Sequence, residues 1–387
     1  MAERSLIFPV QEFRDRIARL QEQMAQRGED ALLLSTPADI FYTTGFLTRF
    51  WESPARPWWV IVPAKGAPVA VIPAIGAALM AQTWIRQTVT WDAPDPRDDG
   101  VSLLAQTLCE LTPQNGRIAV PKGLETHVRM PMADYQKVTQ AVQPRQIVDG
   151  TDTIQRVREI KSPAEIAKIR ASCAIADRAF ADVAEFAQHG TPLAQVFRDF
   201  QIALLRHGAD WVSYVAGGAG RGGYVDVISP ATGAPLQKGD VLMLDTGAVK
   251  DGYFCDFDRN VAIGPISAEV ARVHAALWDA TEDALAQLRP GMPACDAHRI
   301  LSDGLIKRGA RPGGGRLGHG LGVTLTEWPS FTPRDQTPLR AGMVLTLEPG
   351  AMVGTDKMLV HEENIVLTET GPTLLSTRAT REMQRIG

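Results

Sequence analysis

The chain has few of the residues that build disulfide frameworks and thiolate metal sites. Only four of its 387 residues are Cys, and none of them stands in a C-x-x-C spacing, so neither a disulfide framework nor a zinc knuckle is predicted. No uninterrupted apolar run reaches the roughly 18 residues of a membrane span. The start, MAERSLIFPV, lacks a basic segment followed by a long apolar run, so no signal peptide is predicted. We therefore expect a cytoplasmic protein with no membrane partner.

A strong charge of either sign is also missing. The formal net charge is -4, with 40 Lys and Arg against 44 Asp and Glu, so the overall field gives no reason to expect a nucleic-acid partner. Hydrophobic residues make up 45% and charged residues 22%, which is ordinary for a folded globular chain. At roughly 150 residues per domain, the length indicates two or three domains.

The N-terminal part has the pattern of an α/β domain. Residues 13–28 carry apolar side chains at helical spacing and end in Gly, which predicts a helix and its stop. Residues 30–36 and 58–74 are apolar runs typical of buried strands, the second interrupted by a Lys-Gly turn.

A helix start marks the join to the C-terminal part. Ser162, Pro163 and Glu165 form an S-x-x-E capping box with Pro at the first helical position. We place the boundary just before it, between Val148 and Val157, which predicts domains of residues 1–153 and 154–387.

The C-terminal part places acids in strand-like apolar surroundings. Asp245, Asp256, Glu348 and Glu362 lie in or beside apolar runs, and His319 lies in GHGLGVTLTEWP, which alternates like a strand. Taken singly, each has an ordinary alternative as a turn acid, a solvated edge residue or a satisfied His. Buried acids are costly unless they are paired or bind a cation. Four acids and one imidazole together favour a two-metal site for Mn²⁺, Fe²⁺, Co²⁺ or Zn²⁺.

Five motifs in this order resemble one family. LDTG, CDFDRN, GHGLG, LTLEPG and HEENIVLTETG are similar to the motifs of the creatinase, prolidase, aminopeptidase P and methionine aminopeptidase superfamily, and the layout is closest to Xaa-Pro dipeptidase-like proteins. The resemblance runs from about Ser162 to the C-terminus. It implies an α+β protein with a C-terminal pita-bread catalytic domain and an N-terminal creatinase-like α/β domain.

The resemblance also implies a role for each acid. Asp245 would hold one metal, His319 and Glu348 the second, and Asp256 and Glu362 would bridge both. Glu348 would also accept the proton of the attacking water. Two cations lower the pKa of water and polarise a scissile carbonyl, which fits a metallohydrolase.

Three positions around the substrate depart from the family pattern. No His lies between His207 and His274, Thr326 stands where a second His is usual, and Val360 stands where prolidases have Arg. Loss of such a donor raises the barrier to carbonyl attack.

Other polar residues are candidates to take over these roles. Thr326 and His361 are predicted to assist catalysis, and Tyr224 and Arg221 to bind substrate. His361 has an open alternative, because a strand His can equally face away from the metals.

Aromatic residues in the N-terminal domain are a further candidate surface. In dimeric relatives a loop of the partner's N-terminal domain lines the pocket, so the resemblance implies a homodimer and a substrate contact by Trp51. Core or dimer packing is the alternative for Trp51 and its neighbours Trp58 and Trp59.

The simplest substrate is an Xaa-Pro dipeptide. One alternative is a hydrolase of a non-peptide amide or amidine of the ectoine or creatine type. An osmolyte lyase is another, although lyase relatives have a D-x-D motif where this chain has Gly247. An inactive binding homologue is the third.

Overall fold

The computed structural model describes residues 7–51 and 57–387, and the chain divides into two compact units, Met1–Arg158 and Glu159–Gly387. The boundary predicted after Thr153 falls inside helix α6 (Thr151–Arg158). This helix belongs to the first unit because Thr153 donates to Glu29 Oε2 at 2.8 Å and Arg158 pairs with Asp39 at 2.8 Å.

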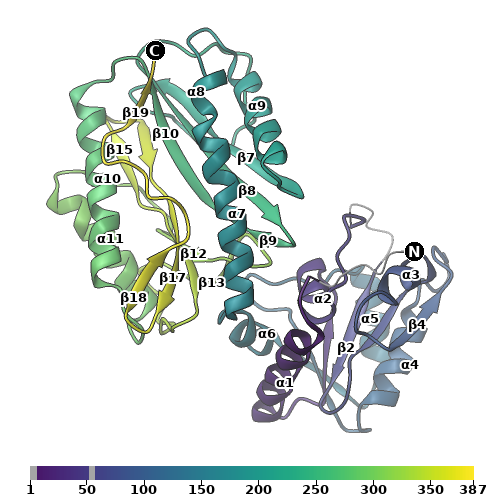
Figure 1. Ribbon diagram of the computed structural model, residues 1–387. Coiled ribbons are helices and arrows are strands. Elements are labelled where there is room, and N and C mark those ends of the chain that lie inside the picture. Colours follow the sequence, from purple (N-terminus) through teal and green to yellow (C-terminus); the bar gives the residue numbers. More distant parts are fainter. Residues whose placement is uncertain (1–6, 52–56) are drawn as a thin grey trace. The chain divides into compact units, whose positions relative to one another are not determined.

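The N-terminal unit is built on a mixed sheet of strand order β4-β3-β2-β1-β5-β6, with helices packed on it (Figure 1). Strands β1 and β2 pair antiparallel and β1 and β5 pair parallel. Its strands are β1 (Ala31–Leu34), β2 (Trp59–Pro63), β3 (Val69–Pro73), β4 (Gln87–Trp91), β5 (Arg117–Val120) and β6 (Gln146–Asp149). Besides α6, its helices are α1 (Val10–Arg27), α2 (Pro37–Thr44), α3 (Ala77–Met80), α4 (Val101–Leu111) and α5 (Met132–Ala141), with a 3-10 turn η1 (Ala74–Gly76).

The predicted elements of this unit are confirmed. Helix α1 ends at Gly28, whose φ of 65° is the left-handed conformation that favours glycine at a helix end. The apolar runs of β1, β2 and β3 are buried along their whole length, as expected for central strands covered on both faces.

The C-terminal unit has three sheets, of strand orders β19-β10-β8-β7, β11-β15-β16 and β13-β12-β14-β17-β18, with β9 paired to β8. The helices lie on the outside of the sheets (Figure 1). They are α7 (Pro163–Ala181), α8 (Val183–Phe186), α9 (Leu193–Arg206), α10 (Ala268–Gln287) and α11 (Ala294–Lys307). The strands are β7 (Trp211–Arg221), β8 (Asp240–Lys250), β9 (Tyr253–Phe254), β10 (Phe257–Ile263), β11 (Arg311–Pro312), β12 (His319–Gly320), β13 (Glu327–Ser330), β14 (Val344–Leu347), β15 (Gly350–Val353), β16 (Lys357–Val360), β17 (Glu363–Thr368), β18 (Gly371–Leu374) and β19 (Gln384–Ile386).

The capping box that was predicted at the start of α7 is present. The backbone N–H of Glu165 donates to Ser162 Oγ at 3.2 Å, and the backbone N–H of Ser162 donates to Glu165 Oε2 at 3.0 Å. Both orphan donors of the first turn are thereby satisfied.

The interpretation of residues 318–329 as one alternating strand was wrong. Only His319 and Gly320 form β12, and the chain then bends until β13 begins at Glu327. The carboxylate of Glu327 accepts the backbone N–H of Thr324 at 3.2 Å, which closes this bend. Within residues 7–51 and 57–387, no helix is long and apolar enough to cross a membrane.

Candidate metal centre

The five predicted ligands come from strands of two different sheets. Asp245 lies within β8 and Asp256 directly before β10, while His319 begins β12, Glu348 follows β14 and Glu362 directly precedes β17. Strand ends are where a side chain can leave its sheet to meet a neighbouring sheet. Asp256, His319 and Glu362 are buried, whereas the Glu348 side chain keeps 19% of its exposure.

Three of these side chains can hold one cation. Asp256, His319 and Glu362 each offer a ligand atom, and these atoms lie within 4.8 Å of one another. The His319 Nε2 atom lies 3.2 Å from Asp256 Oδ2 and 3.8 Å from Glu348 Oε1. The Nδ1 atom of His319 lies 2.7 Å from the carbonyl of Gly320. A carbonyl only accepts, so Nδ1 carries a hydrogen, and Nε2 is the ring nitrogen that faces the acids and could bind a cation.

Asp245 joins the group through a tyrosine that the sequence did not single out. The Tyr214 hydroxyl lies 3.1 Å from Asp245 Oδ1 and also bonds Asp256 Oδ1. The structure therefore brings together all five residues that the sequence selected, and adds Tyr214.

Crowding of these acids in a buried place raises their pKa values. Burial and then the charge of Asp256 raise the pKa of Asp245 and of Glu362 well above the ordinary value. For Glu348, burial raises the pKa, and the charge of His319 opposes part of that shift. Acids that are costly to ionise together are stabilised by a cation among them.

One buried oxygen supports the same conclusion. Among the described residues, Glu362 Oε1 has no hydrogen-bond partner, and a buried carboxylate oxygen without a donor is uncommon in folded proteins. Carboxylate oxygens and imidazole are the donors that Mn²⁺, Fe²⁺, Co²⁺ and Zn²⁺ accept. The donor set thus fits a divalent cation.

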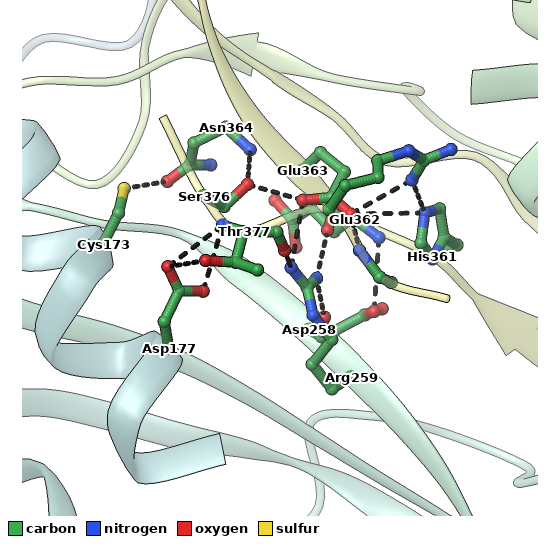
Figure 2. A network of polar contacts seen from close by, with 12 residues as sticks. Cys173, Asp177, Asp258, Arg259, His361, Glu362, Glu363, Asn364, Ser376 and Thr377 are labelled. Carbon is green, nitrogen blue, oxygen red and sulfur yellow. Dashed lines mark hydrogen bonds and ion pairs between the residues drawn. The ribbon is translucent and has the colours of Figure 1, made fainter. Parts of the chain in front are cut away.

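A polar network behind Glu362 holds the candidate ligands in place (Figure 2). The backbone N–H of Glu362 donates to Asp258 Oδ1 at 3.2 Å, and its carbonyl accepts from Arg259 at 2.9 Å. Arg259 also pairs with the buried Glu363 at 3.0 Å. Burial raises the pKa of Asp258 to about 7, and among the described residues its Oδ2 has no partner. The sequence interpretation did not select Asp258, although it lies only two residues after Asp256.

Thr326 lies at the end of a short chain of contacts that reaches Glu348. Its Oγ1 accepts from Arg316 Nη2 at 3.2 Å, and Arg316 Nε lies 3.5 Å from Glu348 Oε1. Thr326 is therefore linked to the acid cluster through Arg316, a residue that the sequence interpretation did not select.

His361 has other neighbours. Its Nε2 is bonded to Arg378 and lies 3.7 Å from Glu363 (Figure 2). Its ring meets His274 edge to face at 6.2 Å. Burial, and then the charge of Arg378, lower the pKa of His361 well below its ordinary value. These contacts favour the alternative of a His that supports the network over that of a catalytic His.

Of the predicted substrate-binding residues, Tyr224 is buried and Arg221 is exposed. The Tyr224 side chain is buried, its hydroxyl lies 3.2 Å from Asn260 Oδ1, and it accepts from the backbone N–H of Val360. These bonds give Tyr224 a structural role. Arg221 is exposed at the end of β7.

Trp51 lies in the N-terminal unit. Its ring packs against Phe46 and Trp58 at centroid distances of 6.4 Å and 5.6 Å, and the Arg129 guanidinium lies 5.1 Å from its centre. A substrate contact by Trp51 stays a prediction.

Comparison with known families divides the chain in the same way. The model of metallopeptidase family M24 matches residues 167–369, and the creatinase/prolidase N-terminal domain matches residues 16–160. These matches confirm the predicted fold class and the predicted family resemblance.

Individual relatives cover nearly the whole chain. An uncharacterized peptidase YqhT of Bacillus subtilis is 27% identical over 92% of this chain and 96% of its own. The crystal structure of dipeptidase PepE from Mycobacterium ulcerans is 27% identical, with a TM-score of 0.84 over 98% of this chain and 99% of its own. A prolidase structure from Thermococcus sibiricus shares the fold, with a TM-score of 0.85 at 24% identity over 97% of this chain and 99% of its own.

Proposed function

Because this chain belongs to metallopeptidase family M24, we propose that it is a metal-dependent hydrolase that cleaves a C–N bond in a small substrate, most simply an Xaa-Pro dipeptide. The observation that carries the proposal is the convergence of Asp245, Asp256, His319, Glu348 and Glu362 from separate strands into one group of buried and half-buried side chains. Names of relatives support the substrate class, since they include a dipeptidase and a prolidase.

In this proposal the acids provide two neighbouring cation positions. On one side, His319 and Glu348 would hold a cation together with Asp256 and Glu362. On the other side, Asp245 would hold a second one with the same two bridging acids. Divalent cations bound there would supply the Lewis acidity that activates water and polarises a carbonyl. Their identity among Mn²⁺, Co²⁺, Zn²⁺ and Fe²⁺ is left to the experiment.

Glu348 is our candidate for the proton acceptor. Its side chain is the partly exposed one beside His319, and its Oε1 faces both His319 and Arg316. A carboxylate in this position can take a proton from water and deliver it to the leaving amine. Arg316 lies beside Glu348 and donates to Thr326, and we propose that these two residues replace the missing second His.

The departure at Thr326 favours one second candidate, a hydrolase of a non-peptide amide or amidine. The lyase is less favoured, because a Cβ at Gly247 would lie 2.4 Å from the Tyr214 ring, so that the second acid of a D-x-D motif has no room here. An inactive binding homologue would keep the acids and bind cations without turnover.

One assay series separates these functions. The protein is loaded with Mn²⁺, Co²⁺ or Zn²⁺ and offered Xaa-Pro dipeptides, longer Xaa-Pro peptides, ectoine- and creatine-type amides, and osmolytes. Metal-dependent release of proline supports the proposal. Turnover of only an amide or an osmolyte supports the alternatives, and bound cation without turnover supports the binding homologue.

Two variants test the bridging acids. We expect Asp256→Ala and Glu362→Ala to lose bound cation and activity while keeping the fold, because each removes a ligand shared by both positions. The exposed acids Asp356 and Glu369 offer matched controls as Asp356→Ala and Glu369→Ala. Full turnover by either bridging variant would refute the assigned roles.

We further propose a cytoplasmic homodimer, as the family resemblance implies. Sedimentation equilibrium of the full chain measures the association state. A monomer with full activity would exclude a contribution of Trp51 from a partner.

A further inference from the structure

Tyr214 reaches the acid cluster because of an irregularity in β7. Strand β7 pairs with β8 in regular register from Val215 opposite Thr246 onwards, but the register shifts between Val212 and Val215. Such bulges redirect a side chain, and they are over-represented beside functional sites. Tyr214 lies in this irregular segment.

The opposite strand makes room for the ring. A Cβ built on Gly247 would lie 2.4 Å from Tyr214 Cε1 and 2.7 Å from its Cδ1, so any side chain at position 247 would displace the ring. Gly247 follows Asp245 by two residues and therefore shares its face of β8. The bulge and the glycine together let a phenol lie directly against Asp245.

The hydroxyl bonds one oxygen of each of the two acids, Asp245 and Asp256, that a cation on this side would need. It bonds Oδ1 of Asp245 and Oδ1 of Asp256, while the other oxygen of Asp256, Oδ2, faces His319 at 3.2 Å. If Asp256 used one oxygen for each of two cations, Oδ1 would be the oxygen available to the Asp245 side. A phenol has one proton, which these two carboxylate oxygens share.

We propose that the Tyr214 hydroxyl competes with a divalent cation for Oδ1 of Asp245 and Oδ1 of Asp256, and thereby sets the affinity of the Asp245 side of the centre. The inference rests on the proposed metal-dependent function. On the His319 side, the Tyr214 hydroxyl makes no described hydrogen bond to His319, Glu348 or Glu362. We therefore expect a cation to bind on the His319 side first. The Asp245 side fills only when the hydroxyl gives up its two acceptors.

Titration with Mn²⁺ tests this directly. Isothermal titration calorimetry and elemental analysis after dialysis are applied to the full chain, to Tyr214→Phe and to Tyr135→Phe, a matched control on α5 of the N-terminal unit. We expect the unaltered protein to bind one Mn²⁺ at least about ten-fold more tightly than a second, since hydrogen bonds to charged groups are of this strength. Tyr214→Phe should bring the second Kd to within about three-fold of the first and leave the first unchanged; Tyr135→Phe should change neither.

Two further variants keep the test decisive. Gly247→Ala displaces the ring by a different route and should reproduce the effect of Tyr214→Phe. Asp245→Asn should remove only the weaker Mn²⁺. The inference is overturned by two equal affinities in the unaltered protein, by a Tyr214→Phe protein with an unchanged or weaker second site, or by loss of both ions in Asp245→Asn. Absence of any bound Mn²⁺, Co²⁺, Zn²⁺ or Fe²⁺ would overturn the proposed function as well, whereas two equal sites with dipeptide turnover would overturn this inference alone.

Discussion

The side-chain amide of Asn364 holds the backbone of Asp256 at both of its polar groups. Asn364 Oδ1 accepts the backbone N–H of Asp256 at 3.0 Å, and Asn364 Nδ2 donates to the carbonyl of Asp256. Asn364 is fully buried, and its own N–H donates to Ser376 Oγ at 3.1 Å (Figure 2). Asp256 precedes β10 and Asn364 lies in β17, so this pair ties together two sheets at the candidate metal centre.

Replacing Asn364 should therefore weaken cation binding without touching a ligand. Asn364→Ala leaves both backbone groups of Asp256 without their partner, and loss of a residue that orients a ligand weakens metal affinity by about 10- to 100-fold. We also expect a loss of about 1–3 kcal/mol in the free energy of unfolding for the unsatisfied groups. Mn²⁺ titration and urea unfolding measure the two effects.

Asn364→Asp is the informative companion. It keeps the acceptor for the N–H of Asp256 and loses the donor to its carbonyl, so it should bind Mn²⁺ more weakly than the unaltered protein. Equal Mn²⁺ affinity in all three proteins would show that the Asn364 amide does not position Asp256.

The candidate ligands were predictable because a local pattern marks each of them. Asp245, Asp256 and Glu348 each adjoin an apolar run, and a charge in such a place needs a partner. The capping box at Ser162 was predictable for the same reason, since it is complete within four residues.

The supporting residues could not be predicted because their roles depend on strand register. Tyr214 matters only because β7 is bulged and Gly247 lies opposite, and Asn364 matters only because β17 lies beside the turn before β10. The predicted domain boundary fell inside α6 because nothing in the sequence of this polar helix indicates which unit it packs on. The bonds of Thr153 to Glu29 and of Arg158 to Asp39 attach it to the N-terminal unit.

Thr326 and Arg316 should affect turnover more than cation binding. Arg316 Nη2 donates to Thr326 Oγ1 at 3.2 Å while its Nε faces Glu348, so the pair orients a group beside the candidate base and provides no ligand. Thr326→Val keeps the shape and loses the acceptor. We expect kcat/KM on the best dipeptide to fall by about ten-fold with an unchanged Mn²⁺ affinity.

Arg316→Lys keeps the charge and loses the planar guanidinium that reaches two partners. We expect it to lower kcat/KM at least as far as Thr326→Val does. The kcat/KM of the double variant should be no lower than that of Arg316→Lys alone, because both changes break the same contact. A Thr326→Val enzyme with full kcat/KM would leave the missing second His without a replacement at this position.

A buried ion pair should dominate the stability of the loop that follows His319. Lys161 Nζ lies 2.9 Å from Glu327 Oε2, with side-chain exposures of 1% and 5%. The other oxygen of Glu327 accepts from Thr324, so this acid also closes the bend before β13. Removing one partner of a buried pair costs about 3–5 kcal/mol, and we expect Lys161→Met to lose this much in urea unfolding.

The double variant Lys161→Met with Glu327→Gln should recover part of that loss, because the uncompensated charge is removed. Lys168→Met is a control, since Lys168 pairs with Asp251 near the surface at 27% and 31% exposure, and it should cost about 1 kcal/mol or less. If Lys161→Met and Lys168→Met lower the free energy of unfolding equally, burial adds nothing to the stability that the Lys161–Glu327 pair contributes.

His274 should make the folded chain sensitive to acid. It lies buried in α10 against the ring of His361, and burial lowers its pKa to about 4. In the unfolded chain His274 has a pKa of about 6.5, so below that pH it binds a proton that the folded chain does not bind. Stability is unaffected above pH 6.5 and falls as the pH drops from 6.5 towards 4, by roughly 3 kcal/mol in all.

His274→Leu should remove this part of the acid dependence of unfolding measured between pH 7 and pH 4, whereas His189→Leu, at an exposed position, should keep it. A His274→Leu protein that loses stability in acid as steeply as the unaltered chain would assign the sensitivity to other groups.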